Sequence, residues 1–244
     1  VAVDAESRLT SPRLNYQTDT DNLIFEGPAR LQRWDKARTA DKPPDTLIQV
    51  QRGSWNLATG RLDASGPVLG ERQPDRSLTA SRLEGNTKEG YLDLMEPVHV
   101  RFGDSEDEIK AGRTRWNYQR RELRSNRPFT ATFEAGEASG TGFIIDEEAT
   151  TVTIASDCRL NQPGEQLRAQ RCRWNWSNER VRAEGDVEVR REALEQITRA
   201  PVLEGVVGED GNLRFSGGGE RVRSRIRLGE PARQQRNGSP AELF

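Results

Sequence analysis

The 244-residue sequence predicts an all-β protein built from about seven repeats of one strand–turn–strand unit. Apolar residues alternate at period two rather than 3.6, turn residues separate the apolar runs, and one spacing recurs along nearly the whole chain. Apolar content is low at 33% and charged content is high at 31%. This composition fits thin antiparallel sheets that are apolar on one face and wet on the other.

The repeat is clearest from Trp174, where an aromatic residue opens the unit. Val181 follows at plus seven and Gly185 at plus eleven, and Val187 and Val189 then alternate with charged residues. Closely similar units begin at Tyr16, Trp55 and Trp116, and degenerate units begin at Gly85, Phe143 and Val206. We expect the unit that opens at Phe143 to have a slightly longer hairpin.

Each unit is predicted to form a strand, a tight turn, a second strand and a bend. Turn residues such as Thr59-Gly60 separate the two apolar runs, and a Gly or Pro such as Gly66-Pro67 stands near plus eleven. Glycine tolerates unusual backbone dihedrals and proline cannot donate to a ladder, so the strand should bend at plus eleven. Residues 35–46 are predicted to form a loop and residues 191–199 one short helical turn. The glycine-rich segment at 135–142 is predicted to be a kinked strand.

The two cysteines flank a turn at residues 161–165. An antiparallel hairpin folded about residue 165 would place Cys158 opposite Cys172, which permits a disulfide in an oxidising compartment. Two buried free thiols are the alternative.

Several kinds of chemistry are disfavoured by the sequence. With 37 basic and 39 acidic residues interleaved, the chain offers no electrostatic footprint for nucleic acid. The single histidine, His99, has no evident catalytic partner and nearly excludes a histidine-based metal site. Acidic clusters at 106–108 and 146–148 are interpreted as turn charge rather than as a glycosidase pair. We therefore expect no enzyme activity, no metal and no cofactor.

Charge and aromatic residues also interleave around Trp116 and Trp174, a pattern that can stack on single-stranded nucleic acid. The simpler interpretation is an amphipathic strand with arginine outward and tryptophan inward. The sequence has no apolar run of eighteen residues. Because it starts at Val1 rather than Met, we expect an N-terminal anchor or signal in the full-length protein; a processed or trimmed soluble protein is the alternative.

The pattern A-x4-W-x6-[LV]-x3-G-x-V-x-V, which extends from Ala169 through Trp174 and Gly185 to Val189, resembles a known family. The chain is similar over roughly residues 7–228 to the OstA-like LptA and LptC proteins of lipopolysaccharide export. About seven units favour an enlarged LptC-like member of cyanobacterial type. We expect a single elongated domain over residues 1–229, followed by a flexible tail at 230–244.

The resemblance implies an elongated β-jellyroll, or β-taco, whose apolar groove carries the acyl chains of lipopolysaccharide across the periplasm. It also implies edge-to-edge strand pairing with neighbouring Lpt jellyrolls, and membrane contact only through an N-terminal anchor. The residues expected to line the groove are apolar and of inward parity: Val50, Trp55, Leu94, Val100, Phe102, Trp116, Phe129, Phe133, Phe143, Ile145, Ile154, Trp174, Val187 and Val189.

Two alternatives stay open from the sequence. A structural or adhesive repeat protein would have the same strands, but with a closed core and no lipid ligand. A carbohydrate-active enzyme on a β-helix would need converging carboxylates, and the sequence contains no clustered set of Asp, Glu and His residues.

Overall fold

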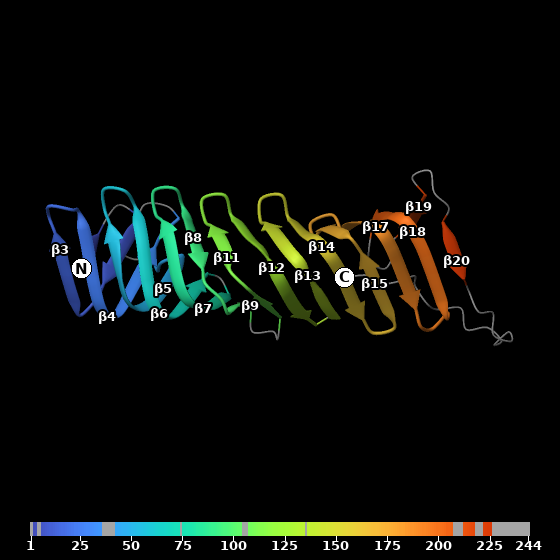
Figure 1. Ribbon diagram of the computed structural model, residues 1–244, viewed down its shortest axis with the longest axis horizontal. Helices are drawn as coiled ribbons and strands as arrows, with labels where there is room; N and C mark the ends of the chain where they lie inside the picture. Colours follow the sequence, from blue (N-terminus) through green and yellow to red (C-terminus); the bar gives the residue numbers. More distant parts are fainter. Residues whose placement is uncertain are drawn as a thin grey trace. The chain divides into compact units, whose positions relative to one another are not determined.

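The computed structural model describes residues 2–3, 6–35, 42–73, 75–103, 107–134, 136–206, 212–217 and 222–225. These residues form twenty strands and no helix, which confirms the all-β prediction (Figure 1). The chain divides into two compact units, Val1–Arg127 and Pro128–Phe244. The tail predicted at 230–244, and residues 36–41 of the predicted loop, lie outside the described residues. The single domain predicted for 1–229 stays a prediction.

Unit 1 contains eleven strands and the start of a twelfth. Their bounds are β1 (Ala2–Val3), β2 (Ser7–Thr10), β3 (Arg13–Gln17), β4 (Asn22–Arg33), β5 (Thr46–Asn56), β6 (Arg61–Arg72), β7 (Arg76–Asn86), β8 (Tyr91–Leu94), β9 (Val98–Phe102), β10 (Glu108–Ala111), β11 (Thr114–Asn117) and β12 (Glu122–Phe133). The boundary between the units falls within β12.

Unit 2 continues with eight further strands. Their bounds are β13 (Gly136–Asp146), β14 (Thr151–Gln162), β15 (Glu165–Ala169), β16 (Arg171–Asn175), β17 (Arg180–Arg191), β18 (Gln196–Val206), β19 (Asn212–Ser216) and β20 (Arg223–Arg225).

Long strands in each unit belong to two layers, because their halves pair with different short strands. In unit 1, β4 pairs with β3 through its first half and with β2 through its second half. Strand β7 pairs with β9 and then with β8. In unit 2, β17 pairs with β16 and then with β15, and β18 pairs with β20 and then with β19. In unit 1 we call the layer with β3, β8 and β11 the turn layer and the layer with β2 and β9 the rim layer. In unit 2 the turn layer contains β16 and β19, and the rim layer contains β15 and β20.

The two layers meet at a line of β-bulges, which we call the crease. The ladder register shifts between Ser65 and Val68 in unit 1 and between Glu184 and Val187 in unit 2. Gly66 (φ 96°) and Gly185 (φ 75°) occupy the left-handed region there, which glycine adopts without a steric penalty. The predicted bend at plus eleven is therefore confirmed in both units.

Tight turns of four residues connect the strands of the turn layer. The asparagine before the turn accepts a hydrogen bond at its Oδ1 from the backbone N–H three residues later, 2.7 Å for Asn56 and 3.1 Å for Asn175. The fourth turn residue has a positive φ at Gly60 (79°), Arg121 (52°) and Glu179 (55°). The side-chain bond and the left-handed residue together reverse the chain.

Neighbouring turns are also bonded to one another. The first turn residue donates its N–H to the left-handed residue of the preceding turn, as Thr87 does to Gly60 at 2.8 Å and Trp176 does to Thr150 at 3.1 Å. The asparagine side chain adds a second bond, from Asn175 Nδ2 to the Ala149 carbonyl at 3.0 Å. Within each unit, such a turn therefore satisfies polar groups of the turn before it. We call this arrangement the turn ladder.

Two details of the predicted repeat are wrong. The residue that pairs with Val152 is Ile145 rather than Phe143, so Ile145 opens that unit, and its four-residue turn is no longer than the others. Residues 192–195 form the turn between β17 and β18 and not a helical turn, because β17 extends to Arg191 and β18 begins at Gln196. The glycine-rich segment lies in strand β13 from Gly136 onward, as predicted.

Candidate lipid-binding faces

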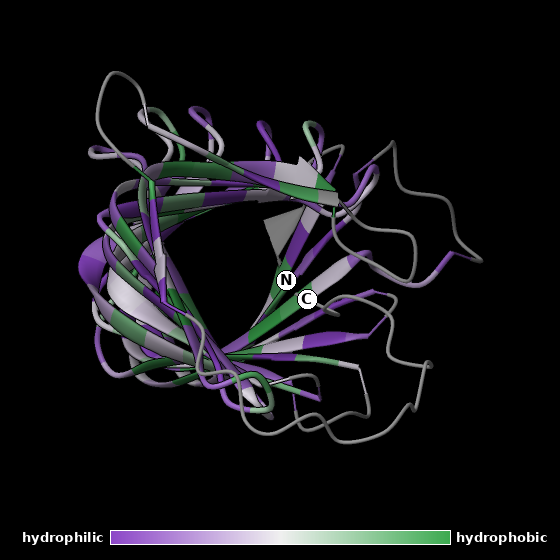
Figure 2. Ribbon diagram, turned by 90° about the vertical axis from the view of Figure 1, so that its right-hand side faces the viewer, coloured by the Kyte–Doolittle hydropathy of each residue, from purple (hydrophilic) through white to green (hydrophobic). Residues whose placement is uncertain are grey.

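Each unit has an inner face on which apolar side chains from both layers meet. Alternate residues of a strand point to opposite faces, and Figure 2 shows apolar and polar residues alternating along the strands. The least exposed large side chains are Leu9, Phe25, Val68, Leu83, Leu94 and Val98 in unit 1, and Phe143, Leu167, Val187, Val189 and Leu203 in unit 2. The hydrophobic effect therefore holds the two layers of each unit together.

Most of the residues predicted to line a groove are buried. These are Val50, Trp55, Leu94, Val100 and Trp116 in unit 1, and Phe129, Phe143, Ile154, Val187 and Val189 in unit 2. Phe102, Ile145 and Trp174 are half-buried. Phe133 was expected to point inward but is 36% exposed, because it is the last residue of β12.

The layers pack closely over much of their inner faces. In unit 2 the rings of Phe129 and Phe143 meet edge to face, with centroids 5.1 Å apart. In unit 1 a cavity of about 20 Å³ remains between the layers, lined by rim-layer residues such as Leu31 and Ile48 and by Leu92 of the turn layer. A cavity of that size holds one or two water molecules. This cavity is therefore too small to hold an acyl chain.

A polar row crosses the inner face of unit 1 at the end of the rim layer. Arg33 pairs with Ser7 on one side and with Thr46 on the other, and Thr46 pairs in turn with Arg72. Arg72 pairs with Arg76. Residues that pair directly across a ladder point to the same face, so three arginines share this face. We call Ser7, Arg33, Thr46, Arg72 and Arg76 the arginine row.

The arginine row reaches across to aromatic residues of the turn layer. The Arg33 guanidinium lies 4.0 Å from the centre of the Tyr118 ring, and that of Arg72 lies 5.4 Å from the centre of the Trp116 ring. Both distances fall within the range of cation–π contacts. These contacts bridge the two layers at the side opposite the crease, which we call the mouth of unit 1.

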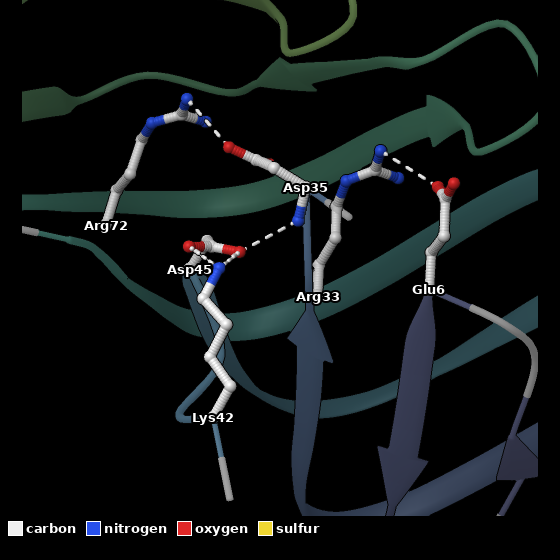
Figure 3. Close-up of polar contacts among 6 residues, drawn as sticks. All are labelled: Glu6, Arg33, Asp35, Lys42, Asp45 and Arg72. Carbon is white, nitrogen blue, oxygen red and sulfur yellow. Dashed lines mark hydrogen bonds and ion pairs between the residues drawn. The ribbon is translucent and has the colours of Figure 1, made fainter. Parts of the chain in front are cut away.

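Acidic residues beside the row pair with two of its arginines (Figure 3). Arg33 Nη2 lies 3.3 Å from Glu6 Oε2, and Arg72 Nη2 lies 3.5 Å from Asp35 Oδ2. The arginine side chains are 19% and 15% exposed, whereas Glu6 is 51% and Asp35 46% exposed. Pairs with such partly solvated carboxylates contribute little to stability. Lys42 pairs with Asp45 at 2.9 Å, and the hydrogen bond from Lys42 holds the pKa of Asp45 below its usual value.

Sequence reasoning missed the arginine row because charged residues were expected to point outward. The sequence feature that could have revealed the row is the inward–outward alternation, which continues to the ends of the strands. Arg33 stands two residues after Leu31, and Thr46 two residues before Ile48, so both continue the inward register.

A disulfide joins Cys158 and Cys172, whose Cα atoms are 6.0 Å apart. The predicted pairing of these residues across one hairpin is wrong. The hairpin turns at Pro163-Gly164, so Cys158 pairs with Ala169, whereas Cys172 lies in β16 opposite Ile154. The bridge therefore connects the start of the rim-layer half of β14 with the turn layer, beside the crease.

Among the described residues, no group of three or more His, Cys, Asp or Glu side chains is arranged to hold a metal ion. The structure also has no helix long and apolar enough to cross a membrane within that part of the chain. His99 is half-buried in β9.

Comparisons with known proteins give a fold-level likeness only. The chain matches no family model and no curated protein. Among solved structures it resembles LptH of Pseudomonas aeruginosa, described as the LptA-homologous periplasmic component of the lipopolysaccharide transport device. The likeness covers 73% of this chain and 82% of LptH, with 7% sequence identity and a TM-score of 0.20. At these values it carries no functional argument.

Proposed function

We propose that this protein is a non-enzymatic, periplasmic lipid carrier of the Lpt type. In this role it binds the acyl chains of lipopolysaccharide between its two layers and forms part of a bridge between the inner and outer membranes. The observation that carries the proposal is the apolar inner face in each unit, whose two layers meet at the crease and which no helix covers in the described residues. Acyl chains gain about 0.8 kcal/mol for each CH₂ that they bury against such a face.

The edges of the sheet support the second half of this proposal, which is strand pairing with neighbouring jellyrolls. Within the described residues, β3 pairs only with β4, and β19 pairs only with β18. The outer edge of each strand thus offers backbone groups to an added strand. An N-terminal anchor, an LptC-like type and a cyanobacterial origin stay part of the proposal.

The groove-lining role of the predicted residues is tested by photo-crosslinking at Trp174. This side chain is half-buried on the inner face of β16, and its indole Nε1 is buried without a hydrogen-bond partner among the described residues. Arg173, its exposed neighbour on the same strand, is the matched control. A benzoylphenylalanine replaces each residue in turn, and the protein is irradiated in an envelope that makes lipopolysaccharide.

We expect a lipopolysaccharide adduct at position 174 and none at position 173. Circular dichroism of both variants checks that the strands form. A folded variant without an adduct at position 174 would contradict lipid carriage. It would favour the alternative of a structural repeat protein with a closed core, which the close packing of Phe129 on Phe143 also supports.

A further inference from the structure

The arginine row holds three buried polar atoms that lack a hydrogen-bond partner among the described residues: Arg33 Nε, Thr46 Oγ1 and Arg72 Nη1. They come from three consecutive strands, because Thr46 pairs with Arg33 on one side and with Arg72 on the other. Paired residues on adjacent strands lie about 5 Å apart. Thr46 is only 3% exposed, and it lines the cavity of unit 1 together with Arg33.

These atoms call for an acceptor that carries negative charge. Arginine nitrogens only donate, and the threonine hydroxyl can donate as well. A buried donor without a partner costs free energy, so such groups are rare unless something binds to them. Tetrahedral oxyanions present several acceptor oxygens to neighbouring donors, and arginine is well suited to them.

The surroundings of the row favour an oxyanion that is attached to an apolar body. Leu31 and Ile48 follow Arg33 and Thr46 on the inner face toward the crease, and both line the same cavity. Polar donors at the mouth and an apolar floor below them match the two ends of an anionic amphiphile. Glu6 and Asp35 are about half exposed, so their carboxylates can stay in water when a ligand binds to the arginines.

We propose that Arg33, Thr46 and Arg72 bind the phosphate group of a phosphorylated amphiphile whose acyl chains lie on the inner face of unit 1. This inference rests on the proposed function and names the headgroup chemistry that it selects. A phosphate is larger than the present cavity, so binding draws the Arg33 guanidinium off the Tyr118 ring and opens the mouth. Charge-assisted hydrogen bonds to phosphate are stronger than the cation–ring contact that they replace.

The test compares three probes by isothermal titration calorimetry with the full chain. Dodecyl phosphate has both a phosphate group and an alkyl chain. Dodecyl glucoside has the same alkyl chain on an uncharged headgroup, and inorganic phosphate has the anion without a chain. We expect dodecyl phosphate to bind at least about tenfold more tightly than the glucoside, the factor that one charge-assisted hydrogen bond supplies. The combined substitution Arg33→Gln and Arg72→Gln should remove this difference.

Two further variants make the result specific. Thr46→Val replaces the hydroxyl by a methyl group and should weaken the binding of dodecyl phosphate by about fivefold. Arg30→Gln removes one positive charge from an exposed position of β4, the strand that also carries Arg33. This control should not change the binding of dodecyl phosphate.

The other outcomes separate this inference from the proposed function. Equal binding of the two amphiphiles by the natural chain would overturn the phosphate site and keep the lipid-binding face. Equal loss of both amphiphiles in the double variant would also overturn it, since the arginines would then only hold the fold. Binding of inorganic phosphate alone, abolished by the double variant, would support the anion site and contradict lipid carriage.

Discussion

The polar rows at the rims of the two units occupy comparable positions but are satisfied differently. In unit 2 the row consists of Gln162, Glu165, Arg191 and Gln196, which pair in that order across β14, β15, β17 and β18. Glu165 is 6% exposed and accepts hydrogen bonds from Arg191 Nε at 2.6 Å and from Gln162 Nε2 at 3.1 Å. In unit 1 the arginine row instead contains no acid, and three of its donor atoms have no hydrogen-bond partner within the described part of the chain.

This difference teaches how one repeat can serve two purposes. A buried carboxylate that meets its arginine within the row closes the rim of unit 2. Arg33, whose contacts in the described residues include the Tyr118 ring and the solvated Glu6, has no buried acid in its row and stays available to a ligand. Of the three predictions that follow, the second tests this contrast between the two rims, and the other two test stabilising contacts elsewhere in each unit.

The largest effect is expected from the disulfide, which lies in unit 2. Replacing Cys158 and Cys172 by serine releases a loop of 14 residues in the unfolded chain. We expect the free energy of unfolding to fall by about 3 kcal/mol, measured by urea denaturation. The natural chain under reducing conditions is the control and should lose a similar amount. A change below 0.5 kcal/mol, on the scale of ordinary surface substitutions, would show that the bridge does not support the crease.

The second effect contrasts the acids of the two rims. Glu165→Gln removes the charge that faces Arg191, whose side chain is 24% exposed, and should cost about 2 kcal/mol in unfolding free energy. Glu6→Gln removes the 51% exposed partner of Arg33 and should cost less than about 0.5 kcal/mol. Thermal denaturation of both variants measures the difference. Equal costs would mean that the two rims are satisfied alike.

The smallest effect is a pH dependence in the turn layer of unit 1. Burial alone raises the pKa of Asp93, but hydrogen bonds from Arg115 and Arg113 at 2.7 and 2.8 Å outweigh it and hold the pKa below its usual value. The folded chain therefore binds fewer protons than the unfolded chain, and the stability present at neutral pH is lost as the pH falls below about 4.

Urea denaturation of the natural chain and of Asp93→Asn between pH 7 and pH 3 measures this contribution. We expect about 1 kcal/mol, since both arginines are substantially solvated. The variant should be less stable at pH 7 and less sensitive to acid. Identical slopes for the two proteins would contradict the assignment to Asp93, and Asp63→Asn in the exposed pair with Arg82 is the control.

The sequence predicted the features that are local in the chain. The seven-residue interval between a residue and its hairpin partner, as in Trp55 and Leu62, follows from a four-residue turn. The bend follows from glycine at Gly66 and Gly185, because few other residues adopt their dihedrals without strain. The buried members of the predicted groove follow from alternation alone.

The features that failed depend on register beyond one hairpin. Gln170 separates β15 from β16, so the residue that pairs with Cys158 in the ladder could not be found by folding the chain about one central residue. Tyr16 opens a unit as the buried Trp55 does, yet it is 46% exposed and donates its hydroxyl to Asp21 at 2.6 Å. The arginine row required knowing that the inner parity continues to the strand ends, where charge is usually solvated.

The turn ladder has a consequence for how such a chain can change its length. Within each unit, a turn donates backbone hydrogen bonds to the turn before it, as Thr87 does to Gly60 and Trp176 does to Thr150. A gene duplication that inserts one whole unit therefore finds its backbone acceptors already in place. A partial insertion would instead interrupt the series. This architecture therefore gains or loses whole repeat units rather than parts of one.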